Sequence, residues 1–147
     1  MQSITGMKII SLYGRGNCGK SETLGLHLRS MILRELQMPP MAEPVSNKDK
    51  DARAVYDVGG RRVTLCPEGD AEWIVAANIR YLEQHPCDIA FSSTRTRGAG
   101  RKRLVAYTRQ AGIPLTELAK PYNDDLNPSG QTEANRQLAE RLFRIIE

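Results

Sequence analysis

Near its start the chain reads Lys8-Ile9-Ile10-Ser11-Leu12-Tyr13-Gly14-Arg15-Gly16-Asn17-Cys18-Gly19-Lys20-Ser21. The first six residues are β-prone and stop abruptly at a glycine, which predicts a strand over residues 8–13. From about Lys20 to Leu36, apolar residues recur at the spacing of a helix. Two prolines follow at positions 39 and 40 and are expected to end this helix. A glycine-rich turn is therefore predicted to join a strand to a helix.

This turn matches the pattern G-x-x-x-x-G-K-[ST] without a gap. Glycines let the backbone fold closely around an anion, with successive N–H groups pointing inward. The helix that follows adds its positive N-terminal end. A strand before the turn and a helix after it are the context in which this pattern binds nucleotide phosphates. The residues expected to contact the nucleotide are Gly14, Arg15, Gly16, Asn17, Cys18, Gly19, Lys20, Ser21 and Glu22.

On these residues the chain resembles the P-loop containing nucleoside triphosphate hydrolase superfamily. The resemblance covers the strand, the turn and the helix, which form about the first quarter of the sequence. It implies binding of a Mg²⁺-nucleotide complex through Gly16–Ser21, with Lys20 reaching the β- and γ-phosphates and the Ser21 hydroxyl ligating Mg²⁺. It does not imply a particular reaction.

The rest of the chain continues the alternation of strands and helices, which predicts one α/β domain over residues 1–147. We expect a mostly parallel sheet of about five strands with helices on both faces. Gly59-Gly60 separates two β-prone runs, and a type I′ turn at this pair would add one antiparallel edge hairpin. The predicted strands are 52–58, 61–66, 88–93 and 113–118; the predicted helices are 71–84, 104–110 and 132–146; the predicted loops are 41–51 and 120–130.

The helix predicted over residues 71–84 is expected to bury one apolar surface. Its residues are Trp73, Ala76, Ala77, Ile79 (or Arg80) and Leu82.

Proteins of this superfamily usually carry an acidic residue at the end of a neighbouring strand, which holds Mg²⁺ directly or through water. Glu68 and Asp70 follow the strand 61–66 and are the first candidates: Asp70 for the metal and Glu68 for orienting an attacking water. Asp70 is an equally good candidate for the N-cap of the next helix. Asp88 is a weaker candidate because it begins its strand, whereas ligands bind at the carboxyl ends of parallel strands.

Positive charge is densest in the segment Thr94–Arg103, which follows a predicted strand. Arg95 and Arg97 are candidates to clamp a γ-phosphate or the phosphate of a second substrate, because a guanidinium can donate two parallel bonds to it. Glycines in the segment would allow it to close as a lid. A solvated basic turn and a nucleic-acid contact through Arg95–Arg103 are the alternatives.

Composition sets wider limits. The 147 residues are 40% hydrophobic and 26% charged, with a net charge of +4, which suits an anionic partner. No apolar run is long enough to cross a membrane and no secretory signal is recognisable, so we expect a cytoplasmic protein. The three cysteines lie far apart, which argues against a disulfide framework or a zinc site.

These features leave the reaction open between hydrolysis and phosphoryl transfer. The substrate is ATP or GTP with Mg²⁺, and ATP is favoured because no N-K-x-D tetrad for guanine follows a late strand. Tyr122, after the last predicted strand, is a candidate to stack on the base, although a surface tyrosine is the simpler interpretation. A small-molecule phosphate acceptor or a protein partner would accompany transfer or switching. The alternative is a nucleotide- or nucleic-acid-binding adaptor without substantial turnover.

Overall fold

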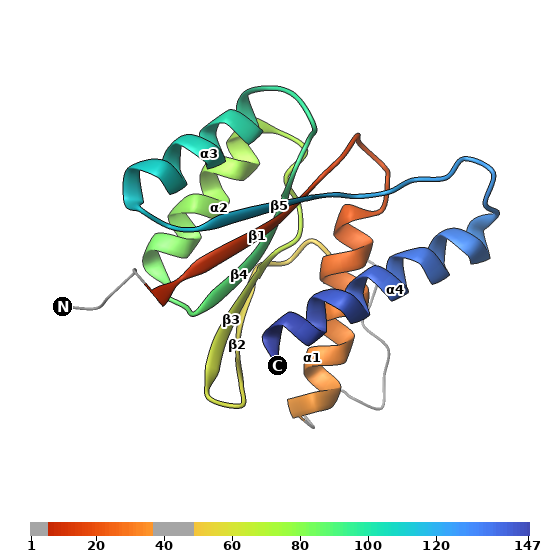
Figure 1. Cartoon of the computed structure of the whole chain (residues 1–147), viewed down its shortest axis with the longest axis horizontal. Helices are drawn as coiled ribbons and strands as arrows, with labels where there is room; N and C mark the ends of the chain where they lie inside the picture. Colours follow the sequence, from red (N-terminus) through yellow and green to blue (C-terminus); the bar gives the residue numbers. More distant parts are fainter. Residues whose placement is uncertain (1–5, 37–48) are drawn as a thin grey trace.

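The computed structural model describes residues 6–36 and 49–147. Its centre is a five-stranded sheet in the order β2-β3-β4-β1-β5 (Figure 1). The strands are β1 (Lys8–Tyr13), β2 (Ala54–Val58), β3 (Arg61–Cys66), β4 (Ile89–Thr94) and β5 (Leu115–Ala119). β3, β4, β1 and β5 are parallel, and β2 pairs with β3 in the antiparallel direction. The predicted α/β class, the five strands and the antiparallel edge hairpin are confirmed.

The hairpin turn follows from its two glycines. Gly59 and Gly60 have φ values of +59° and +86°, the left-handed conformation that a type I′ turn requires at both positions. Strand β2 begins at Ala54, two residues later than expected. The loop predicted over residues 41–51 falls mostly outside the described residues.

Helices cover both faces of the sheet (Figure 1). On one face lie the π-helical stretch η2 (Glu22–Leu28), its continuation α1 (Arg29–Leu36) and the C-terminal helix α4 (Pro128–Ile146). On the other face lie α2 (Glu72–Gln84) and α3 (Ala99–Ala111). Two apolar cores result, one around Leu12, Leu24 and Phe91 and the other around Ile9, Val75 and Leu104.

The helix α3 begins at Ala99, five residues before the predicted start. The basic loop in front of it is therefore much shorter than the predicted segment Thr94–Arg103. Gly98, at φ +112°, precedes the first turn. A Cβ at Gly100 would lie 3.0 Å from the Val75 side chain, so glycine allows α3 to pack closely on α2. Arg101, Lys102 and Arg103 therefore lie on a helix, and Gly100 is not a lid hinge.

The last strand and the last helix also have other boundaries than predicted. The last strand runs from Leu115 to Ala119, and α4 begins at Pro128 because the Asn127 side chain accepts a hydrogen bond from the Gly130 amide at 2.7 Å.

On α2, the buried face is formed by Ile74, Val75, Asn78, Ile79 and Leu82. Trp73 is 73% exposed, so the prediction that it belongs to the apolar face was wrong.

Arg29 ties η2 and α1 to the hairpin side of the sheet. It is only 5% exposed, and it donates to the Gly25 carbonyl at 2.8 Å, to the Tyr56 hydroxyl at 3.0 Å and to the Ala52 carbonyl. Removal of a buried guanidinium leaves these acceptors without a donor.

Arg29→Ala is expected to lower the free energy of unfolding by about 2–4 kcal/mol, because packing and three hydrogen bonds are lost together. Urea denaturation measures the change. Arg34→Ala, on the exposed side of the same helix, is the matched control and should stay within about 0.5 kcal/mol of the unaltered protein. Equal effects of the two substitutions would contradict the structural role of Arg29.

Candidate functional site

The carboxyl ends of the four parallel strands meet at one rim of the sheet, and the glycine-rich turn lies there. Tyr13, the last residue of β1, is in register with Thr94 of β4 and Ala119 of β5. The chain leaves β1 with a hydrogen bond from the Gly14 amide to the Thr94 carbonyl at 3.2 Å. Left-handed conformations follow at Asn17 (φ +59°) and Gly19 (φ +100°), and these fold the turn back towards the helix.

The turn presents backbone donors at its end. The Gly19 carbonyl accepts a hydrogen bond from the Thr23 amide at 2.9 Å, and this is the first bond of the helix. The amides of residues 19–22 precede that bond and have no partner inside the helix, as at every helix N-terminus. The positive end of the helix is therefore directed at the space in front of Ser21.

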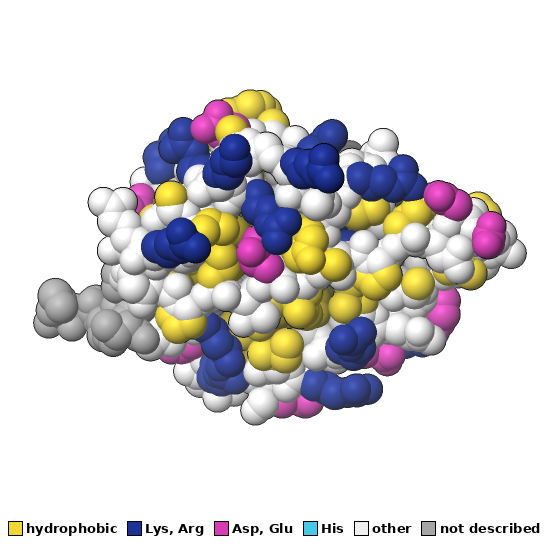
Figure 2. Space-filling view, turned by 45° about the horizontal axis from the view of Figure 1, so that its top comes forward, with side chains coloured by type: hydrophobic (Ala, Val, Ile, Leu, Met, Phe, Trp, Pro, Cys, Tyr) yellow, Lys and Arg dark blue, Asp and Glu magenta, His cyan; other side chains and the backbone are white. Residues whose placement is uncertain are grey.

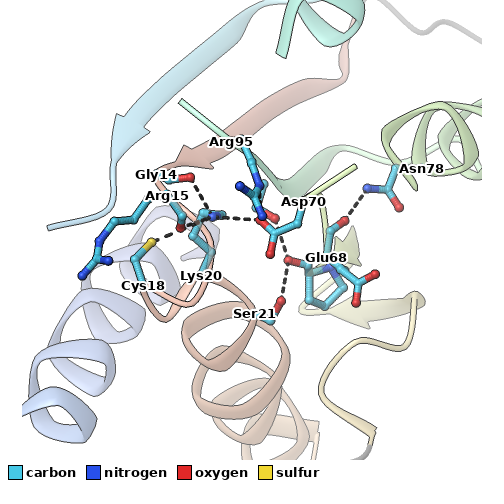
Figure 3. A network of polar contacts seen from close by, with 11 residues as sticks. Gly14, Arg15, Cys18, Lys20, Ser21, Glu68, Asp70, Asn78 and Arg95 are labelled. Atoms are coloured by element: carbon cyan, nitrogen blue, oxygen red, sulfur yellow. Dashed lines mark hydrogen bonds and ion pairs between the residues drawn. The ribbon is translucent and has the colours of Figure 1, made fainter. Parts of the chain in front are cut away.

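Lys20 lies at the centre of the site. It is 4% exposed, and its Nζ atom donates to the carbonyls of Gly14 and Arg15, both at 2.8 Å (Figure 3). The same Nζ lies 3.1 Å from Oδ1 of Asp70. The turn therefore holds its own lysine, and the charge of this lysine faces the segment that follows β3.

Carboxylates face the turn across a cavity of about 320 Å³. Glu68 and Asp70 line it from the segment after β3, and Lys50 and Asp51 line it from the segment before β2. Burial, together with the hydrogen-bonded carboxyl of Asp51, raises the pKa of Glu68. Ser21, Glu22 and residues 17–20 form the opposite wall. One wall of the cavity is thus rich in carboxylates, and the other consists of the turn and the helix N-terminus.

Hydrogen bonds to backbone carbonyls fix the segment that carries these acids. The Pro67 carbonyl accepts from Ser21 Oγ at 3.3 Å and from Ser93 Oγ at 2.7 Å, and the Glu68 carbonyl accepts from Asn78 Nδ2 at 2.8 Å (Figure 3). A Cβ at Gly69 would lie 1.7 Å from the Ser93 carbonyl oxygen, so no larger residue fits without displacement of the backbone. The acids are therefore held by β4, α2 and the helix after the turn.

Asp70 does not cap α2, and that alternative was wrong. The residue before the helix is Ala71, and no side-chain cap bond is present there. Asp70 instead points towards Lys20 and Arg95 (Figure 3). Asp88 lies at the opposite rim, where its carboxylate accepts a hydrogen bond from the Arg62 amide at 2.7 Å.

The structure separates the two candidate arginines. Nε of Arg95 lies 3.9 Å from Oδ1 of Asp70, and a Cβ at Gly16 would lie 2.8 Å from Nη2 of Arg95. Arg95 therefore extends over the glycine-rich turn. Arg97 lines cavities beside α3 and does not line the cavity in front of Lys20.

A second cavity of about 260 Å³ lies on the other side of the turn, between the turn and α4. It is lined by Tyr122, Asn135 and residues of the turn that include Asn17 and Gly19. The Arg15 guanidinium lies 4.3 Å from the centre of the Tyr122 ring, and Arg15 also pairs with Asp124 at 3.1 Å. Tyr122 therefore borders the turn, in contact with Arg15.

Sequence reasoning missed three residues near the turn. Asp51 was part of a predicted loop and carried no motif. Lys120 is buried beside Gly14, and burial lowers its pKa. Asn135, on α4, donates to Glu22 at 2.7 Å. No local pattern singled them out, because only the fold places these distant segments beside the turn.

Within residues 6–36 and 49–147, no group of three or more His, Cys, Asp or Glu side chains is arranged to hold a metal by itself. No helix in the same ranges is long and apolar enough to cross a membrane. Comparisons with known protein families, with curated proteins and with solved structures find no significant match.

Glu68→Gln should stabilise the protein progressively as the pH rises. Because the native-state pKa of Glu68 is raised, its contribution to stability is full below the unfolded-state pKa and is lost as the pH rises through the native value. The substitution removes this loss. Urea unfolding from about pH 4 to pH 8 measures the difference between the variant and the unaltered protein.

Glu133→Gln is the control, because its effect on stability should change with pH in the opposite direction. A hydrogen bond from Arg136 lowers the pKa of Glu133, so this carboxylate stabilises the fold at high pH and the contribution is lost as the pH falls. The stability difference should therefore become less favourable to this variant as the pH rises. The same trend in both variants would contradict the environment assigned to Glu68.

Proposed function

We propose that this protein binds a Mg²⁺-nucleoside triphosphate, with ATP as the first candidate, and cleaves it by hydrolysis or phosphoryl transfer. The proposal places the chain with the P-loop nucleoside triphosphate hydrolases. The observation that carries it is the position of Lys20. Its Nζ faces a cavity with the helix N-terminus on one side and Glu68 and Asp70 on the other.

The turn meets the chemical needs of a phosphate chain. The amides of residues 19–22 have no partner inside the helix, and phosphate oxygens accept hydrogen bonds from such amides. Lys20 is already held at the mouth of the turn by two carbonyl oxygens, so little side-chain freedom remains to be lost on binding. In the proposed complex a phosphate oxygen takes the place of Asp70 beside Nζ.

The residues for Mg²⁺ are Ser21 and Asp70. Both offer oxygen atoms, which are the ligands that Mg²⁺ prefers, and the ion usually completes its shell with water and phosphate. When bound, Mg²⁺ would neutralise charge on the β- and γ-phosphates. Ser21 is already directed at the acidic segment, since its hydroxyl donates to the Pro67 carbonyl.

Glu68 is the proposed general base. Its raised pKa leaves it a better proton acceptor than an ordinary carboxylate. In hydrolysis the oxygen of a water attacks the terminal phosphorus and the bond to the leaving diphosphate breaks, while Glu68 takes the proton. An acceptor hydroxyl in place of water would give phosphoryl transfer. Arg95, over the turn, would stabilise the charge that develops on the phosphate oxygens.

Lys20→Ala should weaken binding of Mg-ATP by about 100-fold or more, because a buried cation beside the phosphates is lost. Isothermal titration calorimetry measures the affinity for Mg-ATP and for Mg-GTP, and the comparison of the two gives the base preference. Lys8→Ala, at the other end of β1, is the matched control and should bind normally. If Lys20→Ala binds triphosphate as well as the unaltered protein, the proposed site is wrong.

Glu68→Gln should retain triphosphate affinity but lower turnover by about 10²–10⁴-fold, the usual contribution of a general base. Release of phosphate from Mg-ATP and Mg-GTP is measured with and without candidate hydroxyl acceptors. Glu72→Gln, on the exposed first turn of α2, is the control and should leave turnover unchanged. Tight binding with no turnover in any arm would favour the alternative of a nucleotide-binding adaptor.

A further inference from the structure

Beyond the triphosphate site, we propose that the exposed face of α3 binds the phosphodiester backbone of a nucleic acid. The surface is a shallow groove of about 620 Å³, here called the α3 groove. Four cations line it: Arg97 from the loop before α3, and Arg101, Lys102 and Arg109 from the helix. Between them lie the small apolar side chains of Val105 and Ala106.

All the charged side chains that line the α3 groove are positive. No Asp or Glu occurs between Asp88 and Glu117, whereas that interval holds six Arg and Lys residues. Of the described residues, none that lines the α3 groove is acidic. Lys and Arg side chains are spread along the upper part of the view in Figure 2, with fewer Asp and Glu side chains beside them. Such a surface attracts a polyanion.

Most of the groove cations are free to meet a ligand. Arg101 is held by Glu117 at 2.7 Å and lies 3.9 Å from the centre of the Tyr13 ring, so it anchors the helix to the sheet. Arg97, Lys102 and Arg109 are exposed, and no ion pair joins them to another described residue. Their charge has no fixed partner in this part of the protein.

The spacing suits a phosphate backbone. Lys102 and Arg109, the two free cations of the helix, are seven residues apart, which is about 10 Å along its axis. A duplex presents about six phosphate charges over that length. Several phosphates can therefore meet the groove at once, and guanidinium groups can donate to each of them in pairs.

A protein or a membrane fits this surface less well. Stable protein interfaces rely on large buried anchors such as aromatic residues, and membrane-surface helices need a broad apolar face. The large hydrophobic side chains that are exposed in the described residues are Trp73, Tyr122 and Leu126, and none of them lines the α3 groove. Backbone binding to a nucleic acid needs only the charge.

The test compares two triple variants with equal loss of charge. Arg97→Ala/Lys102→Ala/Arg109→Ala removes the three cations of the α3 groove that have no ion-pair partner among the described residues. Arg34→Ala/Arg141→Ala/Arg144→Ala removes three exposed cations from α1 and α4, on the other face of the sheet. All six side chains are exposed, so both variants should fold, and thermal unfolding checks that they do. Fluorescence anisotropy measures binding of labelled duplex DNA, single-stranded DNA and single-stranded RNA across a salt series.

The groove variant should bind at least tenfold more weakly than the unaltered protein. Its plot of log affinity against log salt should be shallower by about 3, one for each phosphate contact removed. The control variant should keep both the affinity and the salt dependence. The DNA and RNA arms then show which phosphodiester is preferred.

The proposal is overturned by equal losses in the two variants, which would mean that only net charge matters. It is also overturned if nucleic acid does not bind, or if polyglutamate or phosphatidylserine vesicles bind more tightly through the groove. Lys20→Ala should still bind nucleic acid. This separates the α3 groove from the triphosphate site, so that either proposal can fail alone.

Discussion

The Pro67 carbonyl joins the three parts of the candidate site. Ser21 reaches it from the helix that follows the glycine-rich turn, and Ser93 reaches it from the end of β4. The carbonyl itself belongs to the segment that carries Glu68 and Asp70. One acceptor therefore sets the distance between the turn and the acids. The close approach of Gly69 to the Ser93 backbone fixes the same segment from the other side, because a side chain there would collide with a carbonyl.

The sheet and the turn could be predicted from sequence because their signals are local. Strand β1 ends at a glycine, Gly59-Gly60 requires left-handed backbone, and apolar runs mark the buried strands. The start of α3 could not be predicted in this way. Gly98, Gly100 and the basic residues after them have the composition of a loop, and only the packing of Gly100 against Val75 on α2 reveals a helix.

The candidate site, like the fold, could be predicted where its residues stand in local patterns. Residues 14–21 and the acids after β3 stand in recognisable patterns, and the strand order brings them to one rim. Asp51 and Lys120 join them from distant segments, and a single sequence holds no signal for contacts of that kind. Trp73 shows the converse error, since a hydrophobic residue on an amphipathic helix is exposed when it falls outside the packed face.

The contact between Lys20 and Asp70 constrains how a ligand could enter. The ammonium group of Lys20 and the carboxylate of Asp70 neutralise each other. A phosphate that approached Lys20 alone would therefore leave Asp70 facing an anion. A divalent cation at Asp70 alone would likewise face the ammonium group. Under the proposed function, a Mg²⁺-triphosphate complex would satisfy both groups at once, since its phosphates would lie beside Lys20 and its metal beside Asp70. On that proposal, the paired charges of Lys20 and Asp70 favour binding of the metal and the nucleotide as one complex over binding of either alone.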